Sequence, residues 1–145
     1  MSASAFSSNK EAVAACVSRK REIQAAYIFG SVATGRTRPD SDIDIAVLVS
    51  RRIPPARFLT YRLQLMADLG AALHRSDVDV VILNNATPLL AHRVLSRGRL
   101  VFERSASARV RFQVRTAALY SDLIPMYETH IRYLKKSVRE GRIVG

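Results

Sequence analysis

The sequence is poor in cysteine, glycine, proline and acidic residues, and each shortage excludes a class of protein. Its single cysteine, Cys16, cannot form an internal disulfide, and 6 glycines and 5 prolines in 145 residues exclude collagen-like repeats and extended disorder. Apolar runs such as residues 43–49 and 78–83 are far shorter than the roughly 20 residues of a membrane-spanning helix. Residues 1–9 lack the basic start and apolar core of a signal peptide, so we expect a cytoplasmic protein.

The acidic shortage leaves an excess of positive charge. Lys and Arg number 23 against 12 Asp and Glu, which gives a formal net charge of +11. Residues 91–145 carry twelve of the basic and four of the acidic residues, so most of the excess lies in this C-terminal segment. One reading is therefore a basic module that binds RNA. The basic residues alternate with apolar ones in a helical pattern, however, which fits a solvated helix face or a surface for an acidic protein equally well.

Hydrophobic periodicity predicts alternating helices and strands. Ser8 and Glu11 have the spacing of a capping box, which predicts a first helix that runs from there to about Arg21. Pro125 lies within a helical pattern at 107–140 and is expected to end or kink that helix near Ile124. The other predicted elements are strands at 24–29, 42–49, 78–83 and 100–102, the first two antiparallel, and helices at 31–34, 55–73 and 88–96.

Two short motifs in residues 27–50 carry chemistry. Gly30 and Ser31 follow the first strand, where a glycine allows close backbone approach, a helix start favours negative charge, and the serine adds a hydroxyl donor. Asp42 and Asp44 open the second strand and face the same side, because side chains alternate along a strand. Paired carboxylates repel unless a cation lies between them, and Mg²⁺ shared with substrate phosphates suits such oxygen ligands. A turn or a solvated strand end explains either motif alone, but their combination indicates metal-dependent phosphate chemistry.

This Gly-Ser, spacer, Asp-x-Asp pattern resembles that of the DNA polymerase β-like nucleotidyltransferases. The resemblance implies an α/β (α+β) fold with a mixed sheet of about four strands flanked by helices, and a C-terminal helical tail. It implies that Gly30 and Ser31 bind the triphosphate of the nucleotide, and that Asp42 and Asp44 hold Mg²⁺. It also implies a third carboxylate from a neighbouring strand, which completes the metal site and helps activate the acceptor hydroxyl.

Two residues compete for the third carboxylate. Asp79 is preferred because it lies deeper in the apolar run at 78–83, while Asp77 would share its face of the strand. Arg36, between the two motifs, is a candidate phosphate ligand, as a guanidinium neutralises phosphate charge. Thr34 stands where relatives often have arginine, which departs from the family pattern.

The chain length and two segments, LNNATP at 83–88 and LYSDLIPMYETHIRYL at 119–134, resemble the minimal nucleotidyltransferase (MNT, or MntA-type) antitoxins. The resemblance implies one nucleotidyltransferase domain over 1–145, with a catalytic core at 9–104 and a basic helical segment at 105–145. It implies an adenylyltransferase that moves AMP from Mg-ATP to a tyrosine hydroxyl of a partner HEPN-domain ribonuclease toxin and so neutralises it. The alternatives are an enzyme acting on a small-molecule hydroxyl, as aminoglycoside nucleotidyltransferases do, a non-catalytic antitoxin, or the RNA-binding module above.

Other chemically capable residues are expected to have structural roles. Cys16 lies in an apolar run and is expected to pack in the core. The histidines His74, His92 and His130 lack the spacing of metal ligands, so packed or surface positions are expected. The apolar residues that recur at helical spacing between 58 and 73 are expected to face the core.

Overall fold

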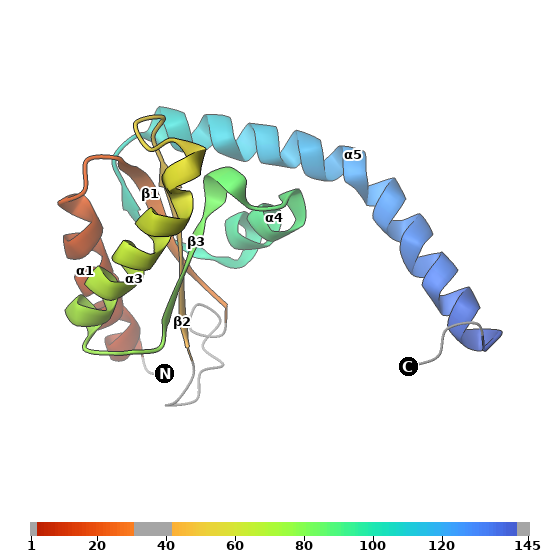
Figure 1. Cartoon of the computed structure of the whole chain (residues 1–145), viewed down its shortest axis with the longest axis horizontal. Coiled ribbons are helices and arrows are strands. Elements are labelled where there is room, and N and C mark those ends of the chain that lie inside the picture. Colours follow the sequence, from red (N-terminus) through yellow and green to blue (C-terminus); the bar gives the residue numbers. More distant parts are fainter. Residues whose placement is uncertain (1–2, 31–41, 142–145) are drawn as a thin grey trace.

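The computed structural model describes residues 3–30 and 42–141. They form an α/β fold whose mixed sheet is flanked by helices, as the sequence predicts (Figure 1). The elements are α1 (Ala3–Ser18), β1 (Ile23–Phe29), β2 (Ile43–Val49), η1 (Pro55–Arg57), α3 (Phe58–Leu73), β3 (Val78–Ile82), η2 (Leu83–Asn85), α4 (Pro88–Arg97), β4 (Arg99–Glu103) and α5 (Ala106–Arg139).

The four strands form one sheet in the order β3-β2-β1-β4. β1 pairs antiparallel with β2, which confirms the sequence prediction, and antiparallel with β4, while β2 pairs parallel with β3. The two central strands are apolar and buried along most of their length because both sheet faces are covered. The parallel pairing of β2 and β3 brings their starting residues to the same end of the sheet.

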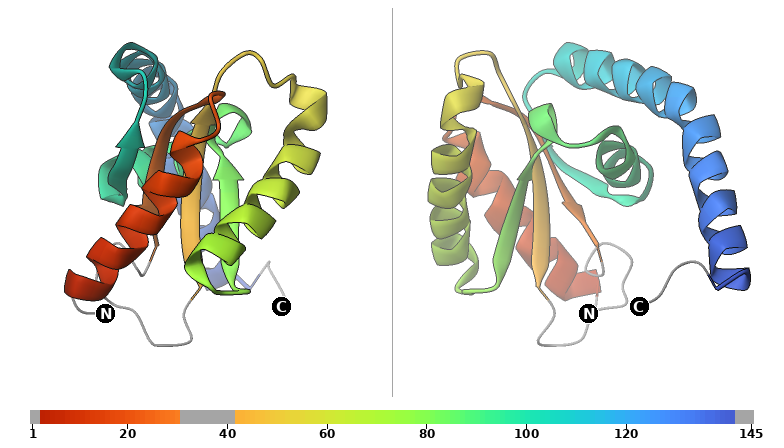
Figure 2. Two further views of the ribbon diagram at one scale, coloured as in Figure 1. Left: turned by 90° about the vertical axis from the view of Figure 1, so that its left-hand side faces the viewer. Right: turned by 45° about the vertical axis from the view of Figure 1, so that its right-hand side comes forward.

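Helices cover both faces of the sheet (Figure 2). On one face, α1 and α3 pack against a cluster that includes Ile28, Ile43, Ile45, Val78 and Val80. On the other face, α4 and the first half of α5 pack against a second cluster that includes strand residues of β1 and β2 and Phe112 of α5. Side chains that point to α1 and α3 therefore alternate along each strand with side chains that point to α4 and α5.

The first helix begins before the predicted capping box. Ser8 and Glu11 lie inside α1, so the capping prediction is wrong, and the helix ends at Ser18 rather than near Arg21. Phe6 packs against the core, and the Arg99 guanidinium of β4 lies 4.6 Å from the centre of its ring. This contact lies outside the predicted helix, and it depends on β4, which is far away in the sequence.

The helix after β2 differs from its prediction in two ways. Pro55 begins the short 3-10 turn η1, and the α-helix itself starts at Phe58. Within α3, Phe58, Leu65 and Leu69 are buried, but Leu59 and Leu63 are 64% and 54% exposed. The expectation that the whole apolar row faces the core is therefore wrong for these two leucines, which lie on the outer side of α3.

The last two helices begin at side-chain caps. Thr87 Oγ1 accepts the Leu90 N–H at the start of α4, and Ser105 Oγ accepts the Ala108 N–H at the start of α5. Of the two predicted effects of Pro125, an end or a kink, the helix does not end there, because α5 continues through this residue. Beyond the sheet, α5 changes direction and runs apart from the body (Figures 1 and 2). In the part of the chain that the structure describes, no helix is long and apolar enough to cross a membrane.

Candidate active site

The site forms where β1 ends and β2 begins. Phe29 pairs with Asp44 across the two antiparallel strands, so Gly30, the next residue, lies against the Asp44 side chain. A Cβ on Gly30 would lie 3.4 Å from Asp44 Cγ and 3.6 Å from Asp44 Cβ, and closer still to Asp44 Oδ2. Gly30 also has a φ of +76°, a conformation that residues with a side chain rarely adopt. The site therefore requires glycine at this position for two independent reasons.

The parallel pairing of β2 and β3 places Asp79 directly beside Asp44. Ile43 and Ile45 face the α1 and α3 layer, as do Val78 and Val80, so both aspartates point to the opposite face of the sheet. Asp42 precedes β2 and is exposed. Two of the three carboxylates predicted from the sequence are thus cross-strand neighbours, and the third lies two residues before one of them.

The carboxylates affect each other's ionisation. Burial raises the pKa of the Asp44 carboxyl, and the negative charges of Asp79 and then Asp42 raise it further. Burial first, and the two like charges second, therefore destabilise the ionised form of Asp44. A divalent cation between these carboxylates would remove the repulsion, so the donor set fits a hard metal ion such as Mg²⁺.

Asp79 has a partner that the sequence analysis missed. Arg62 of α3 donates through Nη2 to Asp79 Oδ1 at 2.8 Å and through Nε to the Val80 carbonyl at 2.6 Å. β3 is an edge strand, so a long side chain from α3 can reach around it to an aspartate on the other face. Nothing in the sequence marks Arg62, because its role depends on how α3 packs beside β3.

Asp77, the alternative third carboxylate, has a different environment. It lies before β3, and the Arg75 guanidinium donates two hydrogen bonds to its carboxylate. These bonds lower the pKa of Asp77, so its charge is compensated within its own loop. The geometry therefore favours Asp79 over Asp77, and the metal-binding role of Asp79 remains a prediction.

The metal site is incomplete in the described residues. Within residues 3–30 and 42–141, no three Asp, Glu, His or Cys side chains gather closely enough to hold a metal ion. Mg²⁺ in proteins keeps several waters and is commonly held by one or two carboxylates plus substrate phosphates, so a pair such as Asp44 and Asp79 suffices to start a site. Ser31, Arg36, and Thr34 in the spacer lie outside the described residues, as does the short helix predicted at 31–34.

The remaining candidates have structural roles. Cys16 is half-buried against the core, and burial raises the pKa of its thiol, which disfavours the reactive thiolate. His74 ends α3 in a left-handed conformation with a φ of 54°. His92 of α4 stacks on Tyr120 of α5 with ring centres 3.7 Å apart. The prediction of packed positions is confirmed for Cys16 and His92.

Comparison with known proteins agrees with this architecture. Residues 11–107 match the family described as Polymerase beta, Nucleotidyltransferase. The chain is 33% identical over 102 residues to the protein adenylyltransferase MntA of Shewanella oneidensis, covering 70% of this chain and 69% of that protein.

Solved structures extend the likeness over nearly the whole chain. A crystal structure of a toxin–antitoxin with AMP-PNP matches 88% of this chain and 98% of its own, with a TM-score of 0.74 and 27% identity. A structure of the tri-AMPylated Shewanella oneidensis HEPN toxin in complex with MNT antitoxin matches 90% of this chain and 98% of its own, with a TM-score of 0.70 and 25% identity.

Proposed function

The chain belongs to the polymerase β nucleotidyltransferase family, and on that premise we propose that it is a protein adenylyltransferase antitoxin. It transfers AMP from Mg-ATP to a tyrosine hydroxyl of a partner HEPN ribonuclease toxin, acts in the cytoplasm and neutralises that toxin. The observation that carries this proposal is Asp44, held beside Asp79 and against Gly30 with uncompensated negative charge. The relatives named for AMPylation of a HEPN toxin support the choice of acceptor.

The proposed nucleotidyltransferase domain covers 1–145 in two segments. The core at 9–104 carries the reacting groups, and a basic helical segment follows at 105–145. Asp42, Asp44 and Asp79 are the residues that would hold Mg²⁺, and Gly30, Ser31 and Arg36 are those that would bind the nucleotide phosphates. Bound Mg²⁺ would withdraw charge from the triphosphate and align its oxygens for in-line displacement.

The reaction is a single displacement at the α-phosphorus of ATP. The phenolic oxygen of the acceptor tyrosine forms a bond to this phosphorus, the bond from it to the oxygen that leads to the β-phosphorus breaks, and pyrophosphate leaves. Asp79 accepts the phenolic proton. The hydrogen bonds from Arg62 and from the Val80 N–H both fall on Asp79 Oδ1, so we assign the proton to Oδ2.

Intact-mass spectrometry tests this function. The chain is incubated with purified HEPN toxin, ATP and MgCl₂, and the toxin should gain the mass of one or more adenylyl groups. The double variant Asp42→Ala, Asp44→Ala should add none. Asp68→Asn serves as the matched control, because Asp68 pairs with Lys20 on the α1 and α3 side of the sheet. An unchanged toxin mass with the unmodified chain would contradict the proposal.

A further inference from the structure

The C-terminal part of α5 carries an apolar stripe. Tyr127, Ile131, Leu134 and Val138, called here the inner stripe, are spaced by four, three and four residues, so they lie on one face of the helix. Of the cationic side chains of this part, Arg132 and Lys136 point away from the inner stripe, while Lys135, four residues after Ile131, borders it. This half of α5 is therefore an amphipathic helix, which normally buries its apolar face.

The inner stripe continues the face by which α5 packs on the body. In the first half of the helix, Phe112 and Thr116 are buried and Tyr120 stacks on His92 of α4. Tyr120 and Tyr127 are seven residues apart, which is close to two full turns, so both point to the same side. The side of α5 that touches α4 thus extends past the end of α4.

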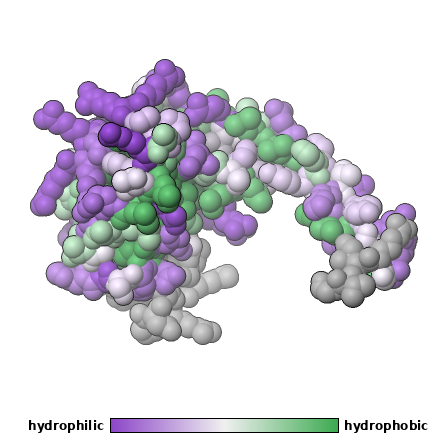
Figure 3. All heavy atoms as spheres, in the orientation of Figure 1, coloured by the Kyte–Doolittle hydropathy of each residue, from purple (hydrophilic) through white to green (hydrophobic). Residues whose placement is uncertain are grey.

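Nothing in the described chain covers the inner stripe beyond Tyr127. Ile131, Leu134 and Val138 are 50%, 38% and 64% exposed. The second half of α5 stands apart from the sheet and its helices (Figures 1 and 2), and hydrophobic side chains are visible along it between hydrophilic ones (Figure 3). The part of α5 after Pro125 is called here the arm. A helix of about four turns is marginally stable in water on its own, so a protein that packs against the arm would stabilise it.

The position of the arm relates the inner stripe to the active site. Ala46 and Leu48 of β2 face α4 and α5, and Asp44 faces the same side because it lies two residues before Ala46. In each view of Figures 1 and 2, the arm descends toward the end of the molecule where β1 ends and β2 begins. A protein held against the inner side of the arm would therefore lie on the face of the sheet to which Asp44 and Asp79 point.

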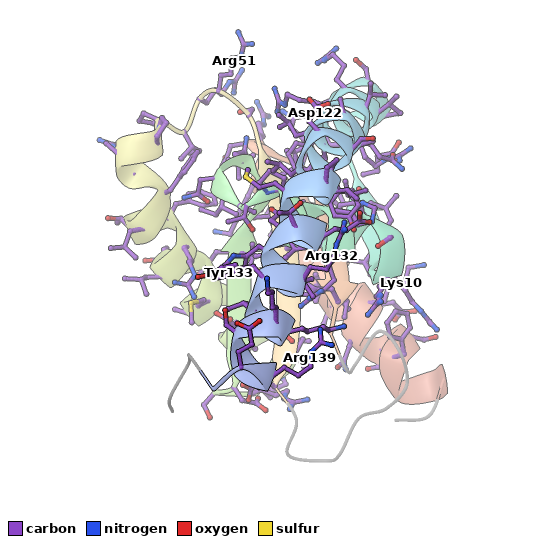
Figure 4. All side chains as sticks on the ribbon, turned by 90° about the vertical axis from the view of Figure 1, so that its right-hand side faces the viewer. Lys10, Arg51, Asp122, Arg132, Tyr133 and Arg139 are labelled. Atoms are coloured by element: carbon purple, nitrogen blue, oxygen red, sulfur yellow. The ribbon has the colours of Figure 1, made fainter. Side chains whose placement is uncertain are left out.

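The positive charge of this chain indicates which kind of partner binds the inner stripe. Figure 4 views the arm from outside, with Arg132, Tyr133 and Arg139 projecting from it. A second copy of this chain would bring its own net charge of +11 against these cations, whereas a protein with an apolar patch and an acidic rim would complement both faces. RNA would suit the cations but would leave the aliphatic stripe uncovered.

We propose that the inner stripe of α5 is the docking surface for the HEPN toxin and holds the acceptor over the face of the sheet that carries Asp44 and Asp79. This inference rests on the proposed function for the identity of the partner. The aliphatic side chains anchor the toxin, and the cations of the arm contact its acidic rim. Because the anchors belong to α5 and not to the strand ends that carry the site, they set the affinity for the toxin and leave ATP binding unchanged.

The test compares two charge-matched variants of the full chain. Ile131→Asp, Leu134→Asp adds two negative charges on the inner stripe, and Arg132→Gln, Lys136→Gln removes two positive charges from the outer face. Affinity for catalytically inert toxin is measured by calorimetry without ATP, and ATP affinity separately. We expect Ile131→Asp, Leu134→Asp, the inner variant, to bind the toxin at least about a hundredfold more weakly than the parent chain. Arg132→Gln, Lys136→Gln, the outer variant, should bind the toxin with an affinity within about tenfold of that of the parent chain. The affinity for ATP should be the same for all three proteins. Circular dichroism, with Ile131→Val as a conservative variant, checks that α5 remains helical.

Each outcome decides the inference. Toxin binding by the inner variant at parental affinity would overturn it, as would a parent chain that self-associates through the stripe in light scattering. Binding of the toxin by the parent chain without any adenylyl transfer would refute the proposed function and leave the docking surface intact. Loss of toxin binding only in the outer variant would replace the apolar surface with an electrostatic one and so contradict the proposal.

Discussion

The close approach of Gly30 and Asp44 predicts an energetic coupling between them. In Gly30→Ala, the positive φ costs roughly 1 to 2 kcal/mol and the crowding of the new methyl against the Asp44 carboxylate about 1 to 3 kcal/mol. Asp44→Ala removes the oxygen and Cγ and leaves Cβ, which would lie at an ordinary contact distance of 3.6 Å. In the Asp44→Ala background, Gly30→Ala should therefore cost only the backbone part, roughly 1 to 2 kcal/mol.

Urea denaturation of the four proteins in magnesium-free buffer measures this coupling. The free energies of unfolding should show a coupling of about 1 to 3 kcal/mol between the two sites, with the double variant less destabilised than the sum of the single variants. Additivity within about 0.5 kcal/mol would show that the methyl does not meet the carboxylate. That result would refute the geometry on which the site is built.

Four further predictions follow from the site and from the arm. The pKa of Asp44 in the folded protein is raised above its usual value of 3.8, so ionisation of this carboxyl destabilises the folded state. The parent chain should therefore lose stability relative to Asp44→Asn as the pH rises from about 3.8 through the raised pKa. Thermal melts without magnesium measure this difference. Added Mg²⁺ should raise the melting temperature of the parent chain and leave that of Asp44→Asn unchanged. Arg62→Gln should lower the free energy of unfolding by no more than about 1 kcal/mol, since the side chains of Arg62 and Asp79 are 39% and 46% exposed. The same variant should nevertheless reduce adenylyl transfer. A loss of several kcal/mol in urea denaturation would contradict this prediction. Pro125→Ala should increase helicity by circular dichroism and weaken toxin binding, because it alters the direction of the arm; unchanged affinity would show that the bend is irrelevant.

The strands and their pairing were predictable from local patterns. Aspartate and isoleucine alternate at residues 42–45, and the residues that follow, up to Val49, are all apolar. The glycine after β1 and the aspartates at the start of β2 mark the ends of two adjacent strands. The preference for Asp79 over Asp77 rested on its depth in the apolar run, and the parallel register that places Asp79 beside Asp44 agrees with it. Alternation along strands carries this information because it fixes which side chains share a face.

The features that depend on tertiary packing were not predictable. Arg62 is one polar residue among several on α3, and only the position of α3 beside the edge strand β3 gives it a partner. The true start of α1 depends on the contact of Phe6 with β4, whereas Ser8 and Glu11 gave a local capping signal inside the helix. Likewise, Pro125 is tolerated within a continuous α5, in a part of the helix that runs free of the sheet.

The most direct test of the central claim identifies the modified atom. HEPN toxin treated with this chain, ATP and MgCl₂ is digested, and its peptides are sequenced by tandem mass spectrometry beside a sample treated with Asp44→Asn. The account predicts AMP on a tyrosine hydroxyl of the toxin in the first sample and none in the second. Unmodified tyrosines in a toxin that is nevertheless bound and silenced, or equal modification by Asp44→Asn, would contradict the account.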